Sequence, residues 1–137
     1  MCALAGRRID PLGGDEARFP LANVPLVKSA IRRLLEQLHP RALVCSAACG
    51  ADLLALDVAR TLGIESHIQL PFAPETFRIS SVVDRPGNWG GLYDAIIDES
   101  KRSGRLTVMR LDQSGDKAFS IVTRRIVSLT NELAETD

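Results

Sequence analysis

Residues 42–62 read ALVCSAACGADLLALDVARTL, and the other elements of the chain are arranged around them. A short apolar run, Ala42–Cys45, precedes six small residues, Ser46–Ala51. Asp52 then opens a segment whose apolar residues recur at helical spacing: Leu53, Leu54, Leu56, Ala59 and Leu62. This order is typical of a buried strand, a tight turn and a helix, and Gly63 is placed to end the helix.

The small residues of the turn have a functional interpretation. They let a ligand approach the backbone N–H groups at the start of a helix, where the helix dipole favours an anion. The first hypothesis is therefore a phosphate-bearing ligand held at Ser46–Ala51.

Outward from this stretch, strand and helix patterns alternate. Strands are predicted over 2–5, 66–72 and 105–111, and helices over 24–38, 75–83, 92–101 and 117–134. The alternation predicts an α/β fold, a Rossmann-like three-layer sandwich with a mainly parallel sheet of four to five strands. The last helix is predicted to bury one stripe of residues: Phe119, Val122, Ile126, Leu129 and Leu133.

We expect residues 1–137 to form a single Rossmann-like domain. A doubly wound fold would usually lay its last helix against a further strand. We therefore hypothesise that a C-terminal strand is missing from this chain, or that a neighbouring molecule completes the sheet edge in a homo-oligomer.

Composition excludes several classes of partner. The charge is balanced, with 17 basic and 17 acidic residues, so no global field attracts nucleic acid or an anionic membrane. No apolar run approaches the roughly 18 residues that span a bilayer. Three cysteines without a C-x-x-C pair and two distant histidines predict reduced thiols and no metal site. We expect a cytoplasmic protein without a cofactor.

Residues that follow the predicted strands are candidate ligand contacts, because ligands of open α/β sheets collect at the carboxyl ends of strands. Gly6, Arg7 and Arg8 follow the first strand, and Pro71 and Phe72 end the third. An arginine here would hold phosphate or carboxylate. The alternative makes Arg7 and Arg8 surface residues paired with Asp10 or Asp15.

Two other side chains have both a functional and a structural interpretation. Trp89 lies in a Gly-rich loop and would either stack on a ligand base or plug the core beneath the loop. His67 alternates with Ile68 inside the third strand, and no orienting partner for a general base is visible, so it is expected to be a partly buried strand residue.

The pattern Ser46-Ala47-Ala48-Cys49-Gly50-Ala51-Asp52-Leu53-Leu54 resembles the GGAxGAD signature of the SLOG superfamily. These Rossmann-like domains are related to DNA-processing protein A and to the LOG lysine-decarboxylase-like proteins. Residues 6–10, Leu70-Pro71-Phe72, Phe77 and Ser81-Val82 agree with it, so the resemblance covers roughly residues 3–100. Ser46 and Ala47 stand where the family often has two glycines.

The resemblance implies a nucleotide or a nucleotide-derived ligand, bound either by a sensor or by a nucleoside-monophosphate phosphoribohydrolase. Carried over, the phosphate-side turn would comprise Ser46, Ala47, Ala48 and Gly50, with Asp52 at the helix start. Asp52 has a plain alternative as a first-turn acid that favours the helix dipole.

Residues 86–94, PGNWGGLYD, loosely match the PGGxGTxxE motif of LOG phosphoribohydrolases. Asn88 replaces the second glycine, Gly91 the threonine and Asp94 the catalytic glutamate. The loop also follows a predicted helix instead of an apolar strand, so we interpret the match as coincidental. Asp94 is the catalytic candidate it offers.

Three functions therefore stay open. The leading prediction is a small sensor-type domain that binds a nucleotide-derived phosphate ligand. The alternatives are a LOG-type phosphoribohydrolase, with Asp94 or Asp52 as its acid, and a scaffold domain that has lost ligand binding.

Overall fold

The elements of the fold follow the predicted alternation. The computed structural model describes residues 1–14, 16–111 and 116–135. In chain order the elements are β1 (Cys2–Ala3), the 3-10 helix η1 (Leu21–Asn23), α1 (Val24–Leu38), β2 (Ala42–Cys45), α2 (Ala51–Leu62), β3 (Glu65–Leu70), α3 (Pro74–Ser81), α4 (Gly90–Ser103), β4 (Leu106–Val108) and α5 (Asp116–Glu135). The α/β prediction is confirmed.

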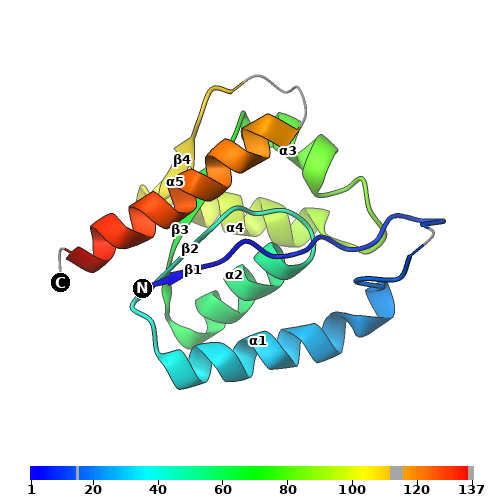
Figure 1. The fold of residues 1–137 in the computed structure, drawn as a ribbon, viewed down its shortest axis with the longest axis horizontal. Helices are drawn as coiled ribbons and strands as arrows, with labels where there is room; N and C mark the ends of the chain where they lie inside the picture. Colours follow the sequence, from blue (N-terminus) through cyan, green and yellow to red (C-terminus); the bar gives the residue numbers. More distant parts are fainter. Residues whose placement is uncertain (15, 112–115, 136–137) are drawn as a thin grey trace.

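The four strands form one parallel sheet in the order β1-β2-β3-β4. The register pairs Cys2 with Leu43, Val44 with His67 and Ile68 with Leu106. Each crossover steps to the next strand in the same direction, and such connections are right-handed, so α1, α2 and α4 lie on one face. Figure 1 shows these helices together on that face and α5 across the other, which completes three layers.

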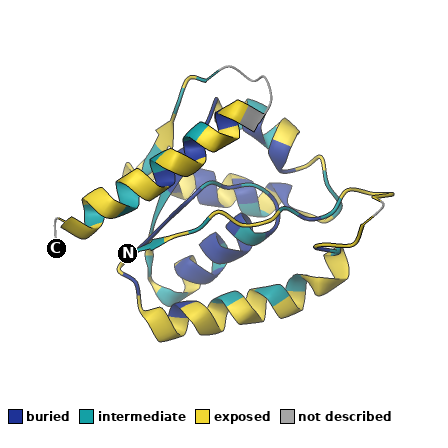
Figure 2. Cartoon of the chain, in the orientation of Figure 1, coloured by how far each residue is buried: buried dark blue, intermediate teal, exposed yellow. Residues whose placement is uncertain are grey.

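The stretch around β2 and α2 is the centre of the core. All four residues of β2 are buried, with Leu43 and Cys45 in the larger apolar cluster. Val44 faces the other way and packs against Val122 and Ile126 of α5. Figure 2 shows α2 largely buried, whereas α1 and α5 expose their outer faces. The sheet is therefore covered on both faces.

Several boundaries differ from the predictions. The helix over 24–38 and the strand over 42–45 are confirmed residue for residue. The helix expected from Leu92 begins at Gly90, and the strand expected over 105–111 spans three residues. The short helix expected over 75–83 spans Pro74–Ser81, since proline suits a first turn.

The predicted buried stripe of α5 is partly wrong. Val122 and Ile126 are buried, but the Phe119 residue is 44% exposed and Leu129 and Leu133 are half-buried. Phe119 lies in the first turns of α5, which border a cavity instead of packing directly on the sheet, so its side chain stays partly exposed. Within the described ranges no strand follows α5, and no helix there has the length and apolar character needed to cross a membrane.

Candidate functional site

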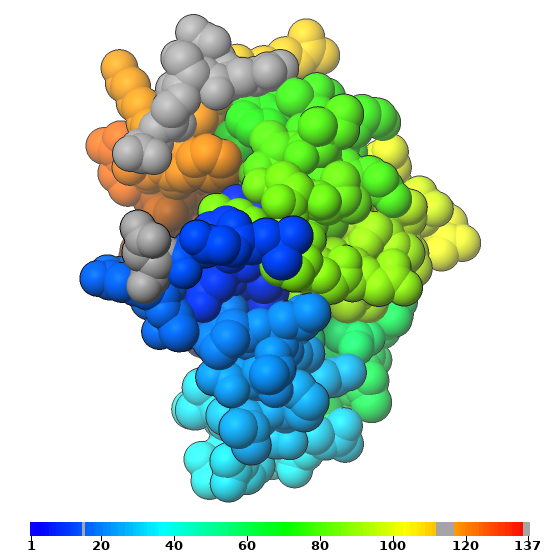
Figure 3. All heavy atoms as spheres, turned by 90° about the vertical axis from the view of Figure 1, so that its right-hand side faces the viewer, coloured from blue at the N-terminus to red at the C-terminus, as the bar shows by residue number. Residues whose placement is uncertain are grey.

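A cavity of about 430 Å³ lies beyond the carboxyl ends of β1 and β2, between α3 and α5. Figure 3 shows the molecule hollowed between the orange α5, the green α3 and the blue segment that follows β1. Its walls come from four parts of the chain: Leu4, Ala5, Gly6 and Arg8; Ser46, Ala48 and Asp52; Phe72, Thr76, Phe77, Ser80 and Ser81; Phe119, Val122, Thr123 and Ile126. Its place agrees with the general position of ligand sites in parallel sheets.

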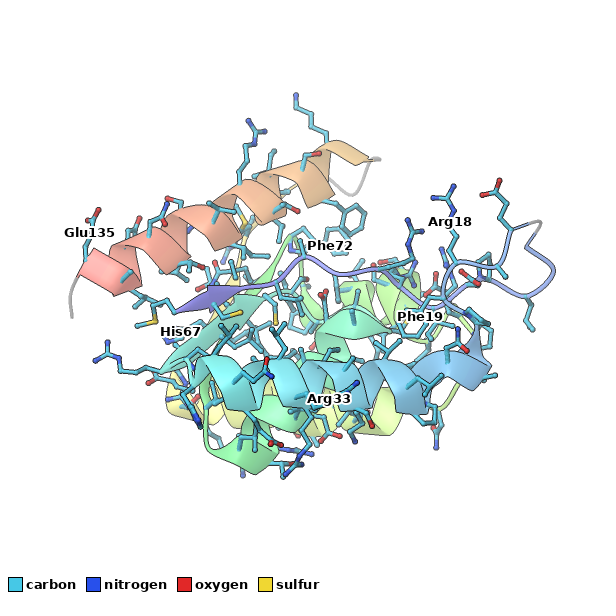
Figure 4. The ribbon with its side chains drawn as sticks, turned by 60° about the horizontal axis from the view of Figure 1, so that its bottom comes forward. Arg18, Phe19, Arg33, His67, Phe72 and Glu135 are labelled. Carbon is cyan, nitrogen blue, oxygen red and sulfur yellow. The ribbon has the colours of Figure 1, made fainter. Side chains whose placement is uncertain are left out.

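One wall of the cavity is aromatic. The ring of Phe72 lies 6.0 Å from that of Phe77 and 6.3 Å, edge-on, from that of Phe119. Figure 4 places Phe72 beneath the start of α5. Val122 and Ile126 continue this surface, whereas Thr76, Ser80 and Thr123 add hydroxyl groups. Such a wall suits a flat, largely apolar group with a few polar edges.

Asp52 is the acidic residue of the cavity. Asp52 is buried, with 7% of its surface exposed. Its carboxyl accepts two long hydrogen bonds, from the Gly6 N–H at an N···O distance of 3.5 Å and from the Ala48 N–H at 3.3 Å. Burial raises the pKa of Asp52 to about 7, although these N–H groups and the charge of Arg8 act in the opposite direction. Near neutral pH this carboxyl is therefore both a donor and an acceptor.

Arg8 brings a cation to the edge of the cavity. Its Nη2 pairs with Asp84, which precedes α4, and donates to the Cys49 thiol at 3.5 Å. Its buried Nε has no hydrogen-bond partner within the described chain. Burial raises the pKa of Cys49, while the Arg8 charge acts to lower it. The guanidinium is thus only partly satisfied by the protein itself.

The turn before α2 is tied to the chain. The N–H groups of Ala48, Cys49 and Ala51 donate to the Asp52 carboxyl, the Ser81 carbonyl and the Arg7 carbonyl, respectively. Gly50 has φ +110°, and a Cβ there would stand 2.6 Å from the Arg7 carbonyl oxygen. Gly50 therefore allows the backbone of residues 7–9 to lie close to the turn. The N–H groups of Ala48, Cys49 and Ala51 already have hydrogen-bond partners within the protein.

The predicted ligand contacts divide into two groups. Six of them line the cavity: Gly6, Arg8, Ser46, Ala48, Asp52 and Phe72. Ala47 is fully buried, Gly50 faces residues 7–9, and the Pro71 carbonyl accepts from Leu111 N–H. Arg7 is exposed and lines an adjoining hollow. Arg8 pairs with Asp84 instead of Asp10, and Asp15 lies outside the described residues.

The α3 and α5 residues that line the cavity were not among the predicted site residues. α3 follows the carboxyl end of β3, the side where ligands collect, so its hydroxyl groups could have been considered. The α5 residues have the spacing of a buried stripe, and nothing in that spacing separates a cavity wall from core.

Trp89 and Asp94 lie outside the cavity lining. Trp89 is 5% exposed and its Nε1 donates to the Pro86 carbonyl at 2.8 Å, so it is the core plug of the structural alternative. Asp94 is exposed on α4 and accepts both hydrogen bonds of Arg78, at 2.9 and 3.1 Å. His67, half-buried in β3, lies 3.0 Å from the Glu65 carboxyl.

The cysteines are free thiols, and burial raises the pKa of Cys45 well above its ordinary value. Among the described residues no group of three His, Cys, Asp or Glu side chains could hold a metal ion.

Comparison with known proteins adds no family to this geometry. No protein-family model, no curated protein and no solved structure matches the chain. The cavity and its side chains are therefore the features from which a function can be inferred.

Proposed function

We propose that this protein is a small sensor-type domain that binds a nucleotide or a nucleotide-derived phosphate ligand. The observation that carries the proposal is the cavity of about 430 Å³, which joins an aromatic wall to a partly satisfied arginine. A base would lie against Phe72 and Phe119, and a phosphate would meet Arg8.

The chemistry of the lining supports this arrangement. Arginine binds phosphate bidentately, and Arg8 is held beside the cavity by Asp84. Burial raises the pKa of Asp52 to about 7, so its carboxyl can carry a proton near neutral pH and then donate to a ribose or a base. The resemblance of residues 46–54 to the SLOG signature agrees with a nucleotide-derived ligand.

Thermal-shift measurements with AMP, ADP-ribose, NAD and cyclic nucleotides test the proposal. A ligand at ten times its Kd should raise the Tm by roughly 3 °C or more, because it binds only the folded chain. Phe119→Ala should weaken binding about tenfold by removing apolar contact. Val127→Ala is the matched control, since Val127 is also half-exposed on α5 but lies outside the cavity lining.

Two results would contradict nucleotide binding in the cavity. If none of these nucleotides changes the Tm at millimolar concentration, the proposal fails and a scaffold without ligand binding is favoured. If Phe119→Ala and Val127→Ala weaken binding equally, the ligand lies elsewhere.

A phosphoribohydrolase is the second candidate function. The observation that favours it is the position of the Asp52 carboxyl in the lining of the cavity. Hydrolysis of an N-glycosidic bond needs a carboxylate beside the ribosyl carbon, where positive charge develops. Asp52 lines the cavity, whereas Asp94 is held by Arg78 outside it. If the protein is a hydrolase, it should release adenine from AMP, Asp52→Asn should abolish release and Asp94→Asn should not. Absence of free adenine on chromatography would exclude this candidate.

A further inference from the structure

A second hollow, of about 740 Å³, adjoins the cavity. The two share Ala5, Gly6 and Arg8 as a common border. We call the second one the arginine hollow, because four of its lining residues are arginines: Arg7, Arg8, Arg18 and Arg85. Figure 4 shows Arg18 projecting from the loop after β1.

Among the described residues of the arginine hollow, the four arginines face three carboxylates, those of Asp10, Glu16 and Asp84. Arg8 and Arg85 share one carboxylate, Asp84, with the Arg85 Nε 3.7 Å from its Oδ2. Arg7 is exposed and has no ion-pair partner within residues 1–14, 16–111 and 116–135. A carboxylate shared by two arginines and a guanidinium without an ion pair favour an anionic occupant.

The two acids that the structure describes in the lining of this hollow, Asp10 and Glu16, have hydrogen-bond partners. Glu16 pairs with Arg18 at 2.8 Å, so this exposed pair contributes little net charge. Both oxygens of the Asp10 carboxyl accept backbone N–H groups at 2.9 Å, from Arg18 and Phe19. Arg85 donates from Nη1 to the Ile9 carbonyl at 2.6 Å and shares Asp84 with Arg8, so Arg7 is the guanidinium of the hollow that has no ion pair among the described residues.

Gly6 lies on the border of both spaces, with Ala5 and Arg8. A Cβ at Gly6 would stand 2.3 Å from the Ala51 Cβ, so the glycine lets the segment after β1 lie directly against the first residue of α2. A ligand that crosses residues 5 and 6 would have one end in the cavity and the other in the arginine hollow.

Building on the proposed nucleotide function, we propose that the ligand carries a nucleoside diphosphate group. Its base lies in the cavity, and its two phosphates cross Gly6 into the arginine hollow. One phosphate meets Arg8 at the border and the second meets Arg7, whose guanidinium has no ion-pair partner among the described residues.

Isothermal titration calorimetry with adenosine, AMP and ADP tests this proposal, with the guanine, cytosine and uracil series in parallel. The diphosphate should bind about tenfold more tightly than the monophosphate. Arg7→Ala should weaken ADP binding about tenfold and leave adenosine binding unchanged. Arg33→Ala is the matched control, because Arg33 is an exposed arginine on α1, distant from the hollow in Figure 4.

The outcomes separate this proposal from the proposed function. If no series binds, both fail. If monophosphate and diphosphate bind equally, or if Arg7→Ala behaves as Arg33→Ala does, the diphosphate proposal is overturned and the nucleotide function stands. An NAD titration shows whether the nucleoside diphosphate group belongs to a dinucleotide or to a free nucleotide. If NAD binds more tightly than ADP, the ligand is a dinucleotide, and if it binds more weakly, the ligand is a free nucleotide. Both results support the proposal.

Discussion

Gly50→Ala is expected to destabilise the fold by roughly 3 kcal/mol or more, a large fraction of the stability of a domain of this size. The backbone of Gly50 has φ +110°, which residues with a side chain rarely adopt. The added Cβ would also meet three backbone atoms of residues 7–9 at 2.6 to 2.9 Å. The segment after β1 would have to move away from the turn, and urea unfolding monitored by circular dichroism measures the loss.

Gly63→Ala separates backbone conformation from crowding. Gly63 also has a positive φ, +72°, but a Cβ there would meet nothing within 4 Å. Its replacement should cost only about 1 kcal/mol. Equal losses for the two variants would show that contact with residues 7–9 is unimportant. Because a side chain at Gly50 would displace residues 7–9, a Gly50 variant that failed to bind a nucleotide would show damage to the fold. It would not show that the ligand contacts Gly50.

The free energy of unfolding is expected to fall as the pH rises from about 4 to about 7, because of Asp52. The unfolded chain releases this proton near the usual pKa of 3.8, whereas burial raises the folded-state pKa to about 7. Between these values the folded state binds more protons than the unfolded state, so raising the pH favours unfolding. The decline from this carboxyl is on the order of 4 kcal/mol and levels off above pH 7.

Asp52→Asn should remove this decline, measured by urea unfolding at a series of pH values from about 4 to about 8. Asp57→Asn, also on α2, is the control. Partial burial acts to raise the pKa of Asp57, but the hydrogen bonds and charges of Lys28 and Arg60 outweigh it and lower the pKa. The Asp57 variant should therefore keep the decline. A wild-type stability that is flat over this range would contradict the assignment of Asp52.

The local parts of the fold could be predicted from the sequence. The apolar run at 42–45, the helical spacing after Asp52 and the closing Gly63 depend only on neighbours in the chain, and all three are confirmed. The parallel sheet also followed, because alternation of strands and helices leaves few other arrangements.

The walls of the cavity could not be predicted in the same way. Arg8 pairs with Asp84 across 76 positions of sequence, and α5 crosses β1, β2 and β3 instead of lying only beside β4. Both depend on strand order, which periodicity does not contain. The small residues of the turn were expected to admit a ligand, whereas the group that lies against Gly50 is the backbone of residues 7–9. A glycine in a sequence does not reveal which group approaches it.

The strand order has a consequence for how the protein assembles. Each strand pairs with the one made just before it, so the sheet and the three helices on its first face can form progressively as the chain is synthesised. The second face must wait for α5, which returns from the last strand to cover the first ones. Val44 remains open to water until then, and the cavity lacks a wall. The cavity is thus the last part to form, and a ligand of the proposed kind would recognise only chains whose folding is complete.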